Sequence, residues 1–243
     1  MALLIAQRTF EPRLWSTLLV IALAAVFIAL GRWQLSRADY KRALFAEFAS
    51  GSDATMSLGA AGSKELRRYQ HVSAAGEFDD SHQVLLDNMT DGEQAGFRVL
   101  TPFLLADGRT VLVDRGWFAL GRSRTDWPVL KVAAGPREIR GRIDELPVPG
   151  IRISADVSEA TPSAWPKLMN FPRLADLELA LGRRLYPRIV LLDANQPDGF
   201  RRDWTPPGFA PERHIAYAVQ WFGMALTLGV LYVIMNLRKQ ASP

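Results

Sequence analysis

The 243-residue chain contains no cysteine and only three histidines. The absence of cysteine excludes disulfide bonds, zinc–thiolate sites, iron–sulfur clusters and a catalytic thiol. A metal centre built from several histidines is also not expected from His71, His82 and His214. Hydrophobic residues make up 49% of the chain and aromatic residues 10%, so it can bury a core and is not expected to be disordered.

The chain also lacks a basic stripe, although its formal net charge is +4. Residues 32–213 carry 25 lysines and arginines against 24 aspartates and glutamates, so this long middle segment is nearly neutral. Nucleic-acid binding depends on clustered cations that release the counterions of the phosphates. We therefore expect no nucleic-acid partner.

Charged side chains are missing from two long runs near the ends of the chain. A helix over 14–30 would be about 26 Å long and one over 215–237 about 34 Å, against a hydrocarbon core of about 30 Å. We therefore predict transmembrane helices over 14–31 and 214–237. Trp15 and Trp33 flank the first run, as interfacial aromatic anchors do. The alternatives are a cleaved signal peptide for the first run and a buried soluble helix for the second.

Two spans place both tails on one side of the membrane. Cationic side chains in short flanks favour the cytoplasm, and the flanks here carry Arg8, Arg13, Arg238 and Lys239. We predict cytoplasmic tails over 1–13 and 238–243, and a periplasmic domain over 32–213, outside the bacterial inner membrane. Small residues spaced four apart predict close contact between the two helices, at Ala25 with Ala29 and at Ala225 with Gly229.

The middle segment is rich in strand-like patterns. The first helix is expected to continue to about residue 48, followed by a flexible linker over 50–63 that is rich in glycine, alanine and serine. A helix is predicted over 174–181, before Gly182. The fold class is therefore a two-helix transmembrane hairpin carrying an α+β, mainly antiparallel β domain or small barrel. Strands are predicted over 72–78, 83–89, 97–105, 110–118, 139–143 and 188–192.

Catalytic motifs are absent from the sequence. It contains no nucleophile elbow, no phosphate-binding loop and no His-x-x-x-His pair, so we predict that the protein is not an enzyme. A serine–histidine–acid set around His71 or His82 keeps one alternative open, a membrane-tethered hydrolase of the cell envelope. That alternative requires a buried histidine–acid pair.

Two motifs are candidates for binding, one in the middle segment and one at the end of the first span. Arg115-Gly116-Trp117 lies at the strand end of a predicted hairpin and has two interpretations, a structural arginine–tryptophan stack or a fixed recognition edge. Trp33, Gln34 and Arg37 lie at the end of the first span. Interfacial anchoring explains Trp33 and Arg37, whereas Gln34 adds a hydrogen-bonding group that an anchor does not need.

His214 opens the second span, and Tyr217, Ala218 and Trp221 follow it at helical spacing. One interpretation is an interfacial belt of His, Tyr and Trp. The other is a ligand site, because the positive end of the helix dipole favours neutral imidazole, the form that binds iron in a porphyrin. Arg32, Arg37 and Arg213 would then meet anionic propionates.

Several short motifs follow one another along nearly the whole chain. They are Gly31-Arg32-Trp33-Gln34-Leu35-Ser36-Arg37 with Lys41, Gly76-x-Phe78, Gly96-Phe97, Thr101-Pro102, Asp107-Gly108-Arg109, Arg115-Gly116-Trp117, Trp165-Pro166 and His214-x-x-Tyr217-Ala218-x-x-Trp221-Phe222. In this order and spacing, the chain resembles the surfeit-locus-protein-one family of respiratory-oxidase assembly factors. Asp114 stands where the family often has asparagine, and Glu212-Arg213 precedes the histidine where asparagine is common.

The resemblance implies assembly of haem–copper cytochrome c oxidase, with haem a insertion into its catalytic subunit. It implies that His214 is a haem a ligand, with Tyr217 and Trp221 beside the cofactor. The implied partners are the oxidase catalytic subunit, haem a synthase and the lipid bilayer. A docking scaffold that binds only protein remains the alternative.

Overall fold

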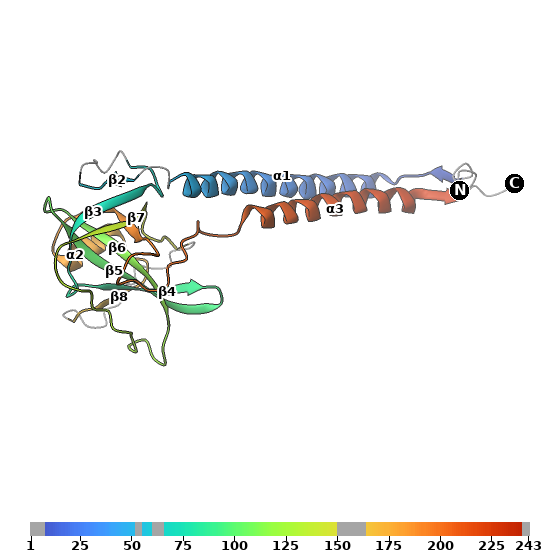
Figure 1. Ribbon diagram of the computed structural model, residues 1–243. Helices are drawn as coiled ribbons and strands as arrows, with labels where there is room; N and C mark the ends of the chain where they lie inside the picture. The colour runs from blue at the N-terminus through green and yellow to red at the C-terminus, as the bar shows by residue number, and fades with distance from the viewer. Residues whose placement is uncertain (1–7, 52–54, 60–65, 150–163, 240–243) are drawn as a thin grey trace. The chain divides into compact units, whose positions relative to one another are not determined.

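The computed structural model describes residues 8–51, 55–59, 66–149 and 164–239 (Figure 1). Two compact units divide the chain. The helical unit combines Met1–Ala46 with Pro206–Pro243, and the β domain comprises Glu47–Thr205. The predicted periplasmic segment 32–213 is therefore longer at both ends than the compact β domain.

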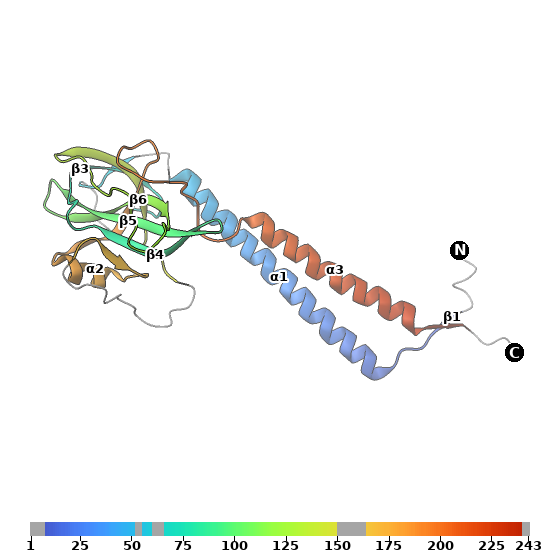
Figure 2. The same cartoon turned by 90° about the horizontal axis from the view of Figure 1, so that it is seen from below.

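Two long helices dominate the helical unit. Helix α1 (Leu14–Ser50) is continuous over 37 residues, which confirms the expected extension beyond the apolar run. Helix α3 (Pro211–Asn236) begins three residues before the predicted span, with a proline in its first turn, where the missing N–H has no helical partner to lose. Figure 2 shows the two helices running alongside one another.

Both helices are long and apolar enough to cross a membrane, and only 6% of each apolar window is buried. Leu19, Ile21 and Leu226 are each at least 60% exposed. So much uncovered apolar surface would be costly in water, whereas it matches the hydrocarbon core of a bilayer. The chain is thus a membrane protein with two apolar helices and a β-rich domain, as predicted.

A regular seam joins α1 to α3. The less exposed positions of α1 recur every three or four residues, as in a coiled coil, at 17, 20, 24, 27, 31, 34 and 38. Gly31 is fully enclosed, because a Cβ there would lie 2.6 Å from Cε1 of the Phe222 ring. Ala25 and Ala29 are exposed instead, so the predicted contact through them is wrong. The contact surface of α1 contains Ala24, Phe27 and Gly31 instead, whereas Ala225 and Gly229 on α3 are half-buried.

A short two-stranded clip joins the start of α1 to the end of α3. Strand β1 (Arg8–Phe10) pairs antiparallel with β10 (Leu237–Lys239). Phe10 packs edge-on against Tyr232, with ring centroids 6.0 Å apart. The pairing places both ends of the described chain at the same end of the helix pair. The last residue of the predicted second span, Leu237, belongs to this clip.

The β domain is built on an eight-stranded sheet in the order β2-β3-β7-β9-β6-β5-β4-β8. Strand β3 pairs with β7 on one side and β5 on the other, so strands β3, β7, β9, β6 and β5 close into a barrel. Most pairings are antiparallel, and β6–β9 is parallel. The strands are β2 (Met56–Ser57), β3 (His71–Phe78), β4 (Val84–Asp91), β5 (Gln94–Leu105), β6 (Thr110–Ala119), β7 (Arg137–Asp144), β8 (Lys167–Met169) and β9 (Leu185–Leu192).

Strand β9 shows how the core is divided. Tyr186, Val190 and Leu192 point into the barrel interior with Phe103. Side chains on the other face of β9 join a second apolar cluster, which helix α2 (Leu174–Leu181) covers through Leu177. This alternation is the two-residue period of a strand buried on both faces. Helix α2 has the bounds that the sequence predicts.

The predicted flexible linker over 50–63 differs from the structure. Met56–Ser57 form β2, which pairs parallel with β3, and Leu58 is completely buried in the barrel core. Residues 52–54 and 60–63 of that prediction lie outside the described part of the chain. Glycine and serine content therefore predicted flexibility where apolar side chains at 56 and 58 anchor a strand.

The β1–β10 clip can be tested with a pair of introduced cysteines, because the chain has none of its own. Thr9 and Arg238 face one another in the antiparallel register. Cα atoms opposite one another in such a pair lie about 4.5–5.5 Å apart, within the range of about 4.4–6.8 Å that a disulfide needs. We expect Thr9→Cys with Arg238→Cys to form an intramolecular disulfide when isolated membranes are mildly oxidised. Non-reducing electrophoresis detects it as a mobility change.

Thr9→Cys paired with Val219→Cys is the control, because Val219 lies about 26 Å along α3 from the end of that helix at Asn236, next to the clip. The control pair should not close within one chain. The clip would be contradicted if the test pair formed cross-links between chains but none within a chain.

Candidate functional site

His214 and Gln34 meet across the helix seam. His214 lies in the first turn of α3, and its Nδ1 is 2.8 Å from Oε1 of Gln34 on α1. An amide oxygen can only accept, so Nδ1 donates. The bond joins residues 180 positions apart in the sequence. It connects two candidate residues whose sequence motifs are separate.

The other predicted residues near the spans occupy different surroundings. Trp221 packs against Phe27, with ring centroids 5.9 Å apart, so it belongs to the seam. Tyr217 is 41% exposed and lies off the seam. Trp33 is likewise exposed, as an interfacial anchor would be, and Arg37 lies over the Tyr40 ring. Within this group, the structure brings together only His214 and Gln34 by a hydrogen bond.

Lys41 forms a second tie within the helical unit. This lysine of the first motif is 9% exposed, and its Nζ donates a 2.6 Å hydrogen bond to the carbonyl of Pro207. Burial lowers the pKa of Lys41, and the nearby Arg37 lowers it further. The bond fastens the extension of α1 to the segment that precedes α3.

Arg115 of the Arg-Gly-Trp motif is buried in the β domain. Its Nε donates to the carbonyl of Asp198 at 2.7 Å, and its Nη1 donates to Oε1 of Gln83 at 2.9 Å and to the carbonyl of Leu130 at 2.8 Å. The guanidinium carbon lies 5.3 Å from the centroid of Phe200. Burial lowers the pKa of Arg115 to about 10, so it stays protonated at neutral pH. The arginine–tryptophan stack predicted for the motif is replaced by this arginine–phenylalanine contact.

The backbone of the motif fastens a segment that we call the strap, residues 198–204. The N–H of Phe200 donates to the carbonyl of Arg115 at 2.7 Å, and Trp117 exchanges two backbone hydrogen bonds with Arg201. Gly116 has φ of +109°, and a Cβ there would lie 2.6 Å from the carbonyl oxygen of Arg201. Glycine is therefore required both by the backbone angle and by the close approach of the strap.

Further bonds anchor the rest of the strap. Trp204 donates from Nε1 to the carbonyl of Leu192 at 2.7 Å, and the guanidinium of Arg98 lies 4.9 Å from its ring centroid. Arg98 also forms a 2.5 Å ion pair with the fully buried Asp114. Burial raises the pKa of Asp114, whereas Arg98 and the N–H of Gly116 act against that rise. The departure Asp114 thus has a cationic partner that an asparagine would not need.

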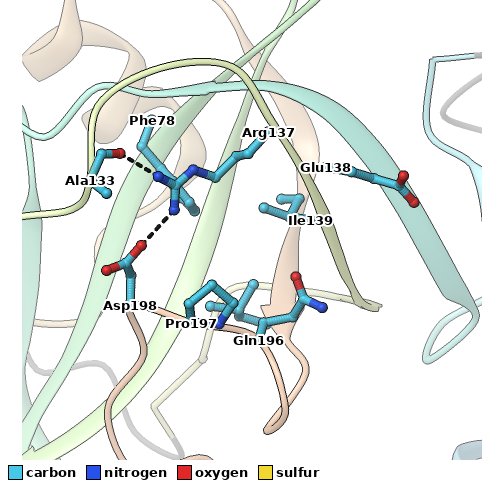
Figure 3. Close-up of a pocket in the computed structure, with 9 residues that line it drawn as sticks. Phe78, Ala133, Arg137, Glu138, Ile139, Gln196, Pro197 and Asp198 are labelled. Carbon is cyan, nitrogen blue, oxygen red and sulfur yellow. Dashed lines mark hydrogen bonds and ion pairs between the residues drawn. The ribbon is translucent and has the colours of Figure 1, made fainter.

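A cleft of about 380 Å³ borders the strap (Figure 3). Arg137 points toward Asp198 in this view, and their ion pair measures 2.5 Å. Asp198 therefore binds Arg137 through its carboxylate and Arg115 through its carbonyl. The sequence predicted neither Arg137 nor Asp198 as a site residue, because no local pattern links residues 61 positions apart.

His82 and His71, the histidines of the hydrolase alternative, have acidic neighbours but do not form the geometry of a catalytic triad. Asp79 and Ser81 both lie on Nδ1 of His82, at 2.9 and 3.0 Å. A triad needs the acid on one ring nitrogen and the serine on the other. His71 lies 3.8 Å from Asp193 through Nδ1, and its buried Nε2 has no hydrogen-bond partner among the described residues.

The described ranges contain no cluster of three or more potential metal ligands among His, Asp and Glu. His214 is the histidine that lies in the first turn of an apolar helix, and its hydrogen bond to Gln34 occupies Nδ1 and leaves Nε2 with a lone pair. One such nitrogen is the donor that a porphyrin iron takes from a protein.

Comparison with known proteins identifies similar chains. The model of the SURF1 family matches residues 21–226. A SURF1-like protein of Rickettsia conorii is 27% identical over 236 residues, covering 92% of each chain. The Surfeit locus protein 1 of Xenopus tropicalis is 26% identical over 262 residues, covering 97% of this chain and 80% of the relative. The match extends over both helices and the β domain.

The Arg-Gly-Trp motif predicts a specific defect for Gly116→Ala. The new Cβ would press on the strap backbone, so we expect a loss of about 2–3 kcal/mol in the free energy of unfolding. Gly135→Ala is the matched control, because Gly135 has φ of +103° but a Cβ added there would meet nothing within 4 Å. Denaturant unfolding of the purified chain, followed by circular dichroism, measures both. Equal losses would show that strap contact contributes nothing.

Proposed function

The chain belongs to the SURF1 family, and we propose that it assists the assembly of a haem–copper cytochrome c oxidase. Its relatives include the Surfeit locus protein 1 of Xenopus tropicalis, which aligns with 97% of this chain. The short motifs of the sequence support the same role, because they follow the order expected for oxidase assembly factors. The proposed role includes maturation of the catalytic subunit.

The observation that carries the haem part of this proposal is the state of His214. Its Nδ1 is engaged by Gln34, so Nε2 is the nitrogen left to bind iron. Exposed apolar side chains such as Val219 line the lipid-facing side of α3. A hydrophobic macrocycle and its tail would lie there against these side chains and the lipid. Bound haem a would supply an iron that one imidazole nitrogen can ligate. His214 would hold it, with exposed Tyr217 beside it.

Membrane orientation belongs to the same proposal. The cationic flanks and the β1–β10 clip support tails that share the cytoplasmic side of the bacterial inner membrane. The β domain would then face the periplasm and dock the oxidase catalytic subunit or haem a synthase. We assign the protein no turnover of its own, and the geometry around His82 supports this, because its serine and aspartate share one nitrogen.

One observation favours the second candidate function, a docking scaffold that binds only protein. The seam is closed where Gly31 meets Phe222, so a macrocycle cannot enter between the helices there. A haem would have to lie on the outer, lipid-facing side of the pair. Under the scaffold function, substituting His214 would leave oxidase assembly intact.

Complementation of a deletion strain separates the two functions. We expect deletion to reduce the haem a absorption of membranes, and the wild-type gene to restore it. His214→Ala should restore it less than the wild type at equal protein level, because the imidazole nitrogen is lost. His82→Ala is the control and should restore it fully. Normal haem a absorption in the deletion strain would contradict a role in oxidase assembly, and full rescue by His214→Ala would favour the scaffold.

A further inference from the structure

We propose that Gln34 is a positioning residue that fixes the tautomer of His214 and thereby selects Nε2 as the ligand atom. The inference rests on the proposed function for the identity of the ligand, a haem. It rests on the structure alone for the tautomer. Gln34 itself would not touch the cofactor.

The geometry determines where the proton lies. Oε1 of Gln34 accepts but cannot donate, so the hydrogen of the 2.8 Å bond belongs to Nδ1 of His214. A neutral imidazole has a single N–H, and Nε2 therefore keeps its lone pair. No described residue forms a hydrogen bond to that Nε2. The atom is free to bind an electrophile such as iron.

The seam keeps Gln34 in place. Gly31 and Ala38, which lie about one turn away on either side, are both buried. Contact between Gly31 and Phe222 brings the two helices close together about one turn of α1 from Gln34. A glutamine on this stripe of α1 cannot turn toward lipid without leaving its partner. In surroundings of low dielectric constant, losing that bond would leave two polar groups unsatisfied.

This arrangement matches what metal-ligating histidines need. Such a histidine usually donates its other ring N–H to an acceptor, which fixes the ring orientation and raises the basicity of the ligating nitrogen. Gln34 is the only described acceptor for Nδ1, and it comes from the other helix. The ligand site would therefore be complete only when α1 and α3 are packed together.

The tautomer can be measured without haem. We would label the full-length protein with ¹⁵N-histidine in lipid nanodiscs and record two-bond N–H correlations at alkaline pH, where imidazole is neutral. The wild type should carry the His214 proton on Nδ1. Gln34→Leu should move it to Nε2 in part or fully, and Gln34→Glu, which keeps an acceptor, should not.

Gln220→Leu is the matched control, because this glutamine lies on an exposed position of α3. It should leave the His214 signals unchanged, and His71 and His82 provide internal references in every sample. A wild-type proton on Nε2, or a Gln34→Leu spectrum identical to that of the wild type, would overturn the inference.

Haem a titration into the same nanodiscs provides the second arm. Loss of an outer partner typically weakens metal binding about 10–100-fold, so Gln34→Leu should weaken haem binding to that extent and Gln220→Leu should not. Unchanged affinity in Gln34→Leu, despite a shifted tautomer, would overturn the positioning role. If the wild type binds no haem while the tautomer responds to Gln34→Leu, the tautomer assignment stands and the proposed haem function fails.

Discussion

The packing of α1 against α3 is the constraint on which the account of the site depends. Phe222 can approach α1 closely because Gly31 has no side chain. At this separation, Gln34 reaches His214, and Lys41 reaches the carbonyl of Pro207. A larger residue at position 31 would press on the Phe222 ring, which would have to move away from α1. Lipid cannot drive apolar helices together as water does, so close packing and polar contacts must hold the pair.

The β domain uses one buried and two half-buried arginines for a comparable purpose. Arg115, Arg137 and Arg98 are each engaged by the strap or by residues beside it. Burying a guanidinium is costly, and removing its acceptors would leave an unpaired charge. The strap is consequently held along its whole length before the chain continues toward α3. The Arg-Gly-Trp motif therefore has a structural function: Arg115 and Gly116 hold the strap, and Trp117 pairs with it through the backbone while its Nε1 donates to the carbonyl of Met89.

Local patterns predicted much of this fold. Helix α2 has the predicted bounds, and both spans and the six principal strands appear near the predicted positions. Strands β2, β8 and the clip were missed, because strands of two or three residues are too short to show an alternation of apolar and polar side chains. The partners of His214 and Arg115 were missed for another reason. Gln34 and Asp198 lie 180 and 83 positions away, and only the folded chain brings them near.

The central claim is that His214 binds haem a through the nitrogen that Gln34 leaves free. Its most direct test is an optical difference spectrum of the protein purified from cells that synthesise haem a, compared with His214→Ala purified from the same strain. We expect stoichiometric haem a with a histidine-ligated spectrum in the wild type and its loss in the variant. Equal haem content in the two preparations would contradict it.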